Sequence, residues 1–446
     1  MTASSTSVDV RIASVAVAVW STVAVWRSVR ALARGDQRAI LFAYVVFYVF
    51  FIVPLIMDLV VGPPTFTYQR GFVLSQNDHT TNIVYLAYLA FVPLVFRLTG
   101  GPPRHELNPL HLRPLDGWLR VFCWAAMLAL PFVMVLSPAP EDFTKYAAFV
   151  GGKAATAKSY QILIITTASL AVVGAVVVLT APNTLALLRI ATLPFLVVGV
   201  WIHGKRSIVA LAVLLTLYLL WTRGVLRGRR FVAAAIVAAV GLAVFSYSYQ
   251  TALGRVDQAA ERRNASVQES PIYVNYRIDY GRDAVTRQTI YAELHPDELR
   301  VLEFRGQSLL FNVAFFIPRR AWPSKPYPYA VYATAAMFDL PPRDIGWGIT
   351  TSWLEEAIAN FGWLGMLLGP LVPALVCRIG DRQRSPFAGL LTVTVASLLL
   401  ILQLIAFMPL VVLWVAAVIR RRRGTPVAQA PVVMRGLSPR RGGPHR

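Results

Sequence analysis

The residues best suited to chemistry lie between positions 311 and 365 of this 446-residue chain. Segment 315–329 contains three cations, four prolines and several aromatic rings. Proline removes a backbone donor and fixes φ, so this composition excludes a regular helix or a central strand and predicts a shaped loop. Arginine holds phosphate through two parallel hydrogen bonds, and lysine acts as a point charge. We therefore expect Arg319, Arg320 and Lys325, together with Arg206, to hold a pyrophosphate, with Trp322 a further substrate-binding residue. The alternative is a surface loop whose cations face lipid headgroups.

A short acidic helix is expected after this loop. Ser352 and Glu355 have the spacing of a capping box, which predicts a helix carrying Glu355, Glu356 and Asn360. A carboxylate beside a cation cluster suits a general base. Glu356 is the first choice, because Asn360 lies one turn further on the same face; Glu355 and His203 follow. The alternative is that both acids only complement the dipole at the start of the helix.

Two further helical patterns lie in the same region. Apolar spacing over 289–304 predicts a helix, with Pro296 able to start a second one. The acidic helix also has an apolar stripe, which predicts that it lies on a membrane surface. The stripe consists of Trp353, Leu354, Ala357, Ile358 and Phe361.

The turn at 201–207 places His203, Lys205 and Arg206 between two apolar runs. The arginine-rich alternate loops predict that this turn lies outside the cell, where cations in a short loop are disfavoured by the positive-inside rule. An anionic ligand would stabilise them there. The alternative is an interfacial anchor whose cations reach lipid phosphates.

Segment 275–283 alternates cations and acids around two tyrosines. Carboxylates and aromatic faces commonly hold sugar hydroxyls and sugar rings. Arg277, Asp279 and Arg282 are therefore candidates for a glycan groove. The alternative is a set of surface charges that pair with one another.

The composition indicates an integral membrane protein. Hydrophobic residues make up 56% of the chain, charged residues 15%, and mean hydropathy is +0.56. The net charge of +21 follows from arginines beside apolar runs, so no nucleic-acid partner is expected. The two cysteines, Cys123 and Cys377, offer no disulfide framework. No P-loop, HExxH or GxSxG motif and no His/Cys cluster occurs, which predicts neither a cofactor nor a metal site.

Eleven apolar stretches have about the length of one bilayer crossing. The expected fold is thus an all-α polytopic membrane protein with a large external loop. We expect spans at 10–27, 39–61, 81–98, 117–138, 158–180, 185–202, 207–222, 231–250, 361–380, 386–402 and 403–420.

Arginine clusters in alternate short loops set the orientation. They predict an external amino terminus and a cytoplasmic carboxyl terminus. Residues 1–250 then hold eight spans, 251–359 form an extracytoplasmic loop domain, and 360–420 hold the last three spans. Residues 421–446 form a disordered basic tail on the cytoplasmic side.

The loop and the acidic helix together resemble the O-antigen polymerase (Wzy-type) family of oligosaccharide repeat-unit polymerases. The resemblance rests on Ile-Pro-Arg-Arg-Ala-Trp-Pro-Ser-Lys-Pro at 317–326 and on an acidic residue before Asn-Phe-Gly at 360–362. The Gly-Lys-Arg-Ser turn at 204–207 is similar to a turn of that family. The first 180 residues are similar only in hydrophobicity. The resemblance implies a bacterial, metal-independent glycosyltransferase of the cytoplasmic membrane that acts on polyprenyl-pyrophosphate-linked oligosaccharides.

Two other readings remain open. An O-antigen ligase would use the same donor with a different acceptor. A flippase or exporter of lipid-linked glycans would also need an external cationic site, but the nearly uncharged spans give it less support. Membrane lipid is an expected partner in each case. For a polymerase, a chain-length regulator and a flippase of the same pathway are further expected partners.

Overall fold

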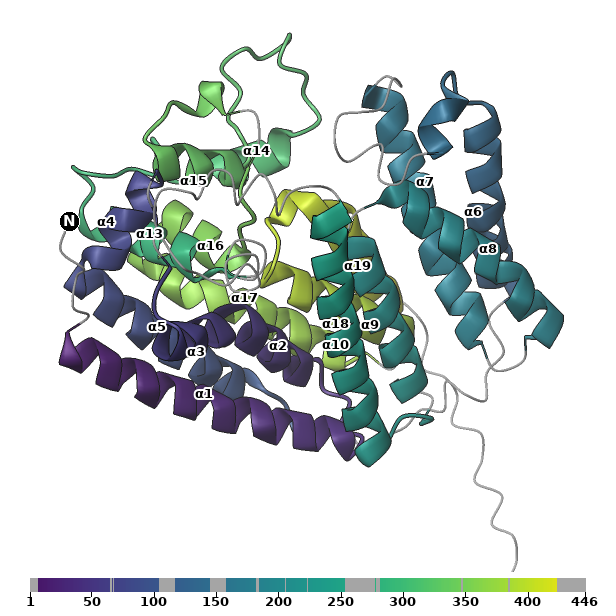
Figure 1. Ribbon diagram of the computed structural model, residues 1–446, viewed down its shortest axis with the longest axis horizontal. Helices are drawn as coiled ribbons and strands as arrows, with labels where there is room; N and C mark the ends of the chain where they lie inside the picture. Colours follow the sequence, from purple (N-terminus) through teal and green to yellow (C-terminus); the bar gives the residue numbers. More distant parts are fainter. Residues whose placement is uncertain are drawn as a thin grey trace, which may run out of the picture.

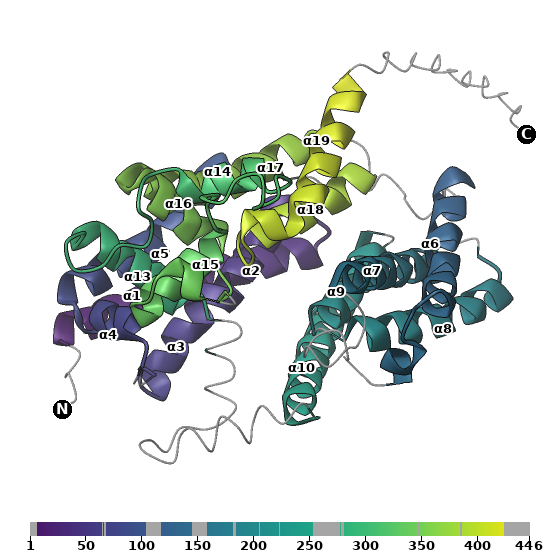
Figure 2. The same ribbon diagram turned by 90° about the horizontal axis from the view of Figure 1, so that it is seen from above.

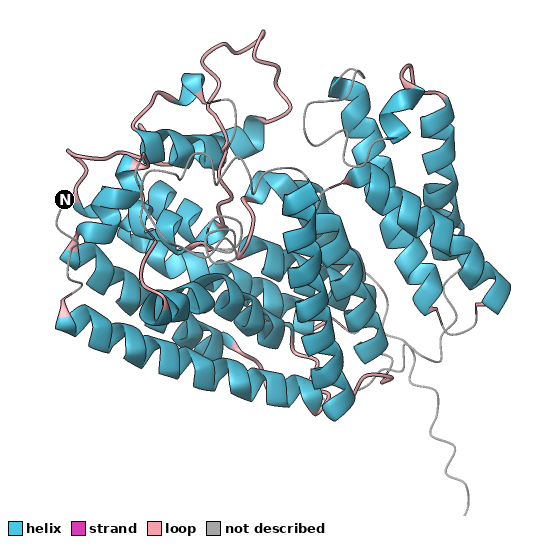
Figure 3. Cartoon of the chain, viewed as in Figure 1, coloured by secondary structure: helices cyan, strands magenta, loops and turns pink. Residues whose placement is uncertain are grey.

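The computed structural model describes residues 7–64, 66, 68–103, 117–144, 158–181, 184–204, 206–222, 224–252, 277, 281–345, 348–383 and 386–422. Every regular element within these ranges is a helix, which confirms the expected all-α class (Figures 1 and 3). The amino-terminal elements are α1 (Val8–Ala33), α2 (Ala39–Phe47), the π-helix η1 (Tyr48–Ile52), α3 (Val53–Val60), α4 (Arg70–Asn77) and α5 (His79–Thr99).

The second quarter of the chain forms a separate group of helices beside the rest (Figures 1 and 2). It contains α6 (Gly117–Val135), the short 3₁₀ helix η3 (Pro140–Thr144), α7 (Lys158–Thr180) and α8 (Ala186–His203). The next two helices are α9 (Arg206–Thr222) and α10 (Arg229–Ala252). Helix α9 joins the two parts, because Trp221 donates from Nε1 to the Leu32 carbonyl at 3.0 Å and packs edge-on against Phe42.

The region around the acidic helix consists of short helices near α4, and α13 packs against α4, α5 and α16 (Figure 1). These are α13 (Asp283–Leu294), α14 (Gln307–Ala314), α15 (Tyr329–Phe338), the 3₁₀ helix η4 (Pro342–Asp344) and α16 (Trp353–Phe361). The chain ends with α17 (Trp363–Asp381), α18 (Pro386–Leu399), the 3₁₀ helix η5 (Leu404–Phe407) and α19 (Met408–Arg422).

Six helices are long and apolar enough to cross a membrane, counted over the described residues. They coincide with six of the eleven expected spans and begin at Val8, Ala39, His79, Leu163, Ala186 and Trp363. The ranges of the other five expected spans overlap with α6, α9, α10, α18 and α19, which are not among these six helices, so the count of eleven spans stays a prediction. The expected division of the last apolar run near Gln403 is confirmed, since α18 ends at Leu399 and Gln403 caps η5.

One hydrophobic core joins the candidate spans to the acidic helix. It includes Phe47, Leu89 and Ala374 of the spans together with Leu354 and Ile358 of α16. Helix α16 is buried along its whole length except at Phe361. The expectation that its apolar stripe lies on a membrane surface is therefore wrong. The stripe faces the core because α17 lies close against it: a Cβ on Gly365 would sit 2.1 Å from the Ala357 carbonyl oxygen.

The expected second helix after Pro296 is also absent from the described residues. Helix α13 ends at Leu294, and residues 295–306 form turns and irregular backbone. The expected shaped loop is confirmed, because residues 315–328 lie between the end of α14 and the start of α15.

The π-helix inside the second span marks where the loop region joins the spans. Pro54 has no backbone N–H, so the Phe50 carbonyl lacks its ordinary helical donor four residues on. The Arg282 backbone N–H supplies that donor at 3.1 Å. The Arg282 guanidinium also lies 5.4 Å above the Phe50 ring. A single proline in a span thus creates the attachment point for the start of α13.

Candidate functional site

Glu356 lies in a buried polar cluster formed by α14 and α16, called here the Glu356 cluster: Glu356, Ser308, Asn312 and Asn360. Ser308 Oγ and Asn312 Nδ2 each donate to Glu356 Oε1 at 3.0 Å. Asn360 Nδ2 donates to Ser308 Oγ at 2.8 Å and to the Glu356 carbonyl at 2.7 Å. Both pairs are spaced four residues apart, so each helix presents its two polar side chains on one face. All four residues are at most 5% exposed.

The pKa of Glu356 is raised to about 7, chiefly by burial and to a smaller extent by the charge of Glu355. Hydrogen bonds from Ser308, Asn312 and the Leu404 backbone N–H lower it. None of the contacts that Glu356 makes within the described residues is to a cation. This carboxyl is therefore able to take up and release a proton near neutral pH.

Glu355 is engaged in the expected capping box, which is confirmed. The Ser352 backbone N–H and hydroxyl both donate to its carboxylate, while Ser352 Oγ accepts from the Leu354 backbone N–H at 3.2 Å. Burial raises the pKa of Glu355, and the Ser352 hydrogen bonds and the Arg282 charge lower it. Both carboxylate oxygens serve to fix the start of α16.

A second buried cluster, called here the Asp58–Asp283 network, contains Asp58, Arg277, Asp283 and Arg287. Arg277 Nη2 lies 2.6 Å from Asp283 Oδ2 and 3.1 Å from Asp58 Oδ1. Arg287 lies 3.3 Å from Asp58 and covers the Tyr85 ring at 4.7 Å. The four side chains are at most 11% exposed. The network balances two acids with two cations and ties α13 to α3 and α5, so it favours the internally paired alternative for Arg277.

Arg282 is likewise an anchor in this structure. It is 3% exposed, and its guanidinium donates to the Ile401 carbonyl at 3.3 Å and to the Gly281 carbonyl at 3.1 Å. These contacts join the start of α13 to the connection between α18 and η5.

The cations of the 315–328 loop have different surroundings. Arg319 donates to the carbonyls of Lys325 and Pro326 at 2.8 and 3.1 Å, with its guanidinium 3.9 Å above the Tyr327 ring. Lys325 Nζ donates to the carbonyls of Phe315 and Ile317 at 2.7 and 2.8 Å. Both hold the loop in shape. Arg320 is exposed, and among the described residues it makes no hydrogen bond or ion pair.

Several predicted site residues are not brought to this region. His203 is buried at the end of α8, in the separate helix group, and a left-handed Gly204 follows it. Lys205 and Asp279 lie outside the described residues, and so does the side chain of Arg206, which begins α9. Trp322 lies on the loop, where its Nε1 donates to Ser324 Oγ at 3.0 Å.

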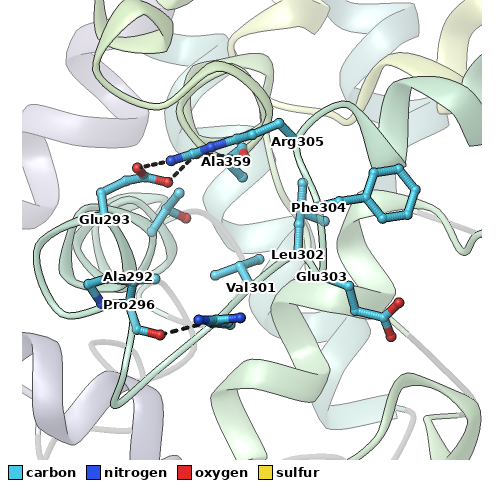
Figure 4. Close-up of a pocket in the computed structure, with 11 residues that line it drawn as sticks. Ala292, Glu293, Pro296, Val301, Leu302, Glu303, Phe304, Arg305 and Ala359 are labelled. Carbon is cyan, nitrogen blue, oxygen red and sulfur yellow. Dashed lines mark hydrogen bonds and ion pairs between the residues drawn. The ribbon is translucent and has the colours of Figure 1, made fainter.

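A cavity of about 180 Å³ lies between α13 and segment 300–305, beside α16 (Figure 4). Arg305 forms a two-point ion pair with Glu293 across it, at 2.5 Å, and reaches the Ala359 carbonyl at 3.1 Å. Arg300 donates to the Pro296 carbonyl at 2.9 Å. This cavity is close to the end of α16 and is lined by charges that already have partners.

The side chains that bind Glu356 and the acids of the Asp58–Asp283 network were not predicted from the sequence. Ser308 and Asn312 are polar residues four positions apart in a helix that is mainly apolar from Leu309 on, which is a signal for a buried polar face. Asp58 stands near the end of an apolar span, where an unpaired acid is costly, so a cationic partner had to exist. Sequence alone does not say that the partners are Arg277 and Arg287.

Among the described residues, no group of three His, Cys, Asp or Glu side chains is arranged to hold a metal ion. Comparisons of the chain with protein families, with curated proteins and with solved structures find no match.

Proposed function

We propose that this chain is a membrane glycosyltransferase that polymerises polyprenyl-pyrophosphate-linked oligosaccharide repeat units into a surface polysaccharide. The observation that carries the proposal is the Glu356 cluster: a carboxyl of α16 with a pKa of about 7, held by neutral donors of α14, the helix that directly precedes the arginine-bearing loop. The motif resemblance of segments 317–326 and 360–362 supports the same class of reaction.

The reaction needs one base and no acid. A hydroxyl oxygen of the acceptor sugar attacks the anomeric carbon of the donor, and the bond from that carbon to the pyrophosphate oxygen breaks. The lipid pyrophosphate leaves with the electron pair, and the hydroxyl proton moves to the Glu356 carboxylate. Pyrophosphate is a good leaving group, so cations rather than a proton stabilise it.

Arg320 is the cation best suited to the leaving group, because it is exposed and makes no described contact, whereas Arg319 and Lys325 bind loop carbonyls. Those two keep the loop in the form that presents Arg320. In this proposal the fork of Arg320 binds the pyrophosphate in bidentate fashion.

Glu356 is 1% exposed, so the acceptor hydroxyl reaches it only when a covering element moves. In the proposed mechanism α14 is that element. It supplies Ser308 and Asn312, and its displacement would uncover Glu356 Oε1. Catalytic contacts in a ligand-free protein often tighten only in the complex.

The proposed arrangement in the membrane has eleven spans, with the amino terminus outside, the carboxyl terminus in the cytoplasm and residues 251–359 on the outer face of a bacterial cytoplasmic membrane. The alternating arginine-rich loops support it. Reporter fusions at Gly281 and Gly424 should then report opposite sides. Fusions that report the same side would remove the external site.

The test of function is polymerisation of purified lipid-linked repeat units by the reconstituted protein, with a chelator present. Glu356→Gln keeps an acceptor for Ser308 and Asn312 but cannot take a proton, so turnover should fall by about 10²–10⁴ with donor affinity nearly unchanged. Glu355→Gln is the matched control, expected to lower stability more than rate. Full activity of Glu356→Gln, or strict dependence on a divalent ion, would contradict the proposal.

The same donor chemistry would serve a ligase. The products of a deletion strain separate the two functions: single repeats on the lipid carrier indicate a lost polymerase, and long chains that stay on the carrier indicate a lost ligase. Normal transfer combined with failure of repeats to reach the outer face would indicate an exporter.

A further inference from the structure

Helix α14 buries its polar side chains and exposes its apolar ones, which is the reverse of a helix that faces water. Its buried residues include Gln307, Ser308 and Asn312, at 4%, 0% and 5% exposure. Its exposed residues are apolar, and the apolar surface continues into the following turn. The α14 patch consists of Leu310 at 41%, Val313 at 73%, Phe315 at 51% and Phe316 at 71% exposure.

The reversal has a local cause. Ser308 and Asn312 point inward because they donate to Glu356, and a helix that presents these positions to α16 must turn positions 310 and 313 the other way. Contiguous exposed apolar surface of this kind marks an interaction site rather than a water-facing face.

The connection to α17 identifies what covers the patch. Helix α14 packs against α16, and only Gly362 separates α16 from α17, a candidate span. The first turns of α17 expose Trp363 at 53% and Leu364 at 58%. Apolar surface on a candidate span faces lipid acyl chains, and Gly365 of α17 lies against Ala357 of α16, so α16 is at the level of the first turns of the span. An element packed on α16 lies at that level.

The charge next to the patch agrees with a lipid partner. Arg320 follows Phe316 by four residues and is exposed without a described partner. A row of apolar side chains followed by a free arginine is typical of a segment that lies in the bilayer interface, with apolar groups below the headgroups and the cation at the phosphates.

We propose that the α14 patch is seated in the outer leaflet of the bilayer, with Arg320 at the level of the lipid phosphates. Lipid then covers one face of α14 while the other face holds Glu356. Contact of the patch with lipid does not depend on glycan polymerisation, whereas its assignment to the outer leaflet rests on the proposed arrangement in the membrane.

The test uses spin labels on the full-length protein in vesicles of phosphatidylethanolamine and phosphatidylglycerol. Cys123 and Cys377, both buried, are replaced by alanine, and single labels are placed by Val313→Cys, Phe316→Cys and Asp344→Cys. Asp344 is the matched control, since it is exposed and lies on a polar turn of the same region. Each label is assayed for collision with oxygen, which concentrates in lipid, and with a water-soluble nickel complex.

Labels at Val313 and Phe316 should collide more with oxygen than with nickel, and the label at Asp344 should do the reverse. Nickel access at Val313 and Phe316 equal to that at Asp344 would mean that the patch faces water and would overturn the proposal. Low access to both reagents would mean that protein covers the patch, which overturns it equally. A normal ligand-free thermal transition for each labelled protein establishes that the fold is intact.

Discussion

Two buried acidic clusters in this molecule hold their carboxylates in different ways. In the Asp58–Asp283 network each acid faces a guanidinium, at distances from 2.6 to 3.9 Å. In the Glu356 cluster the contacts that the carboxylate makes with described residues are to a hydroxyl, an amide and a backbone N–H. Both clusters are nearly closed to solvent.

The difference decides what each cluster can do. In the network the carboxylates pair with guanidinium groups, and these ion pairs join α13 to the spans. Neutral donors leave Glu356 with much of its desolvation cost, so the pKa stays raised, at about 7. The first arrangement suits structure, and the second suits proton transfer near neutral pH.

The largest effect is expected from a substitution that disrupts the Asp58–Asp283 network. Asp283→Ala removes the carboxylate that lies 2.6 Å from Arg277, and removal of one partner from a buried ion pair costs about 3–5 kcal/mol of unfolding free energy. Chemical unfolding in mixed detergent micelles measures it. Asp344→Ala, on an exposed residue, should stay within about 0.5 kcal/mol of wild type. Equal losses of unfolding free energy in the two variants would show that the network does not stabilise the fold.

The pH dependence of stability sharpens the contrast. Because the pKa of Glu356 rises from 4.5 to about 7 on folding, the folded protein holds this proton more tightly than the unfolded chain does. Its contribution to stability is full below pH 4.5, falls by on the order of 3 kcal/mol up to about pH 7, and is constant above. Glu356→Gln should remove this slope. Parallel stability curves for wild type and variant would contradict the raised pKa.

The same contrast applies to the loop cations. Arg320→Ala removes a charge without a described partner, so binding of polyprenyl pyrophosphate should weaken about 10- to 100-fold with an unchanged melting temperature. Arg319→Ala removes the donor to two loop carbonyls, so it should weaken binding and also lower the melting temperature. Arg320→Lys keeps the charge but loses the fork and should be impaired too. Wild-type binding by Arg320→Ala would place the donor site elsewhere.

The smallest expected effect adjusts the Glu356 cluster. Asn312 donates to Glu356 Oε1, and this hydrogen bond lowers the pKa of Glu356. Asn312→Ala should therefore raise that pKa by about one unit, since a hydrogen bond to a charged group contributes at least about 1.5 kcal/mol. The alkaline shift would appear as a displaced rise in the pH–rate profile. An unchanged pH–rate profile would show that the protonation of Glu356 does not control the rate.

Local sequence signals predicted much of this fold. Apolar length predicted helices at the expected spans, the prolines predicted the 315–328 loop, and Ser352 with Glu355 predicted the capping box. Each of these features depends on residues that are neighbours in the chain. The stripe of α16 was also read correctly as apolar, but a stripe does not say whether lipid or protein covers it.

The missed features depend on contacts that form only when the chain folds, most of them between distant segments. Glu356 was chosen from its spacing to Asn360, whereas the side chains that bind its carboxylate come from α14. Arg319 and Lys325 looked available for phosphate, but folding turns them toward carbonyls of their own loop. The network of Arg277 joins three separate elements, so no single window of the sequence contains it.

The most direct test of the central claim is an infrared titration of the Glu356 carboxyl. The difference between wild type and Glu356→Gln isolates the band of one protonated carboxylic acid in the reconstituted protein. We expect this band to disappear as the pH is raised, with a midpoint near pH 7. A midpoint near the ordinary glutamate value of 4.5 would show that Glu356 is ionised throughout the neutral range and would contradict the account.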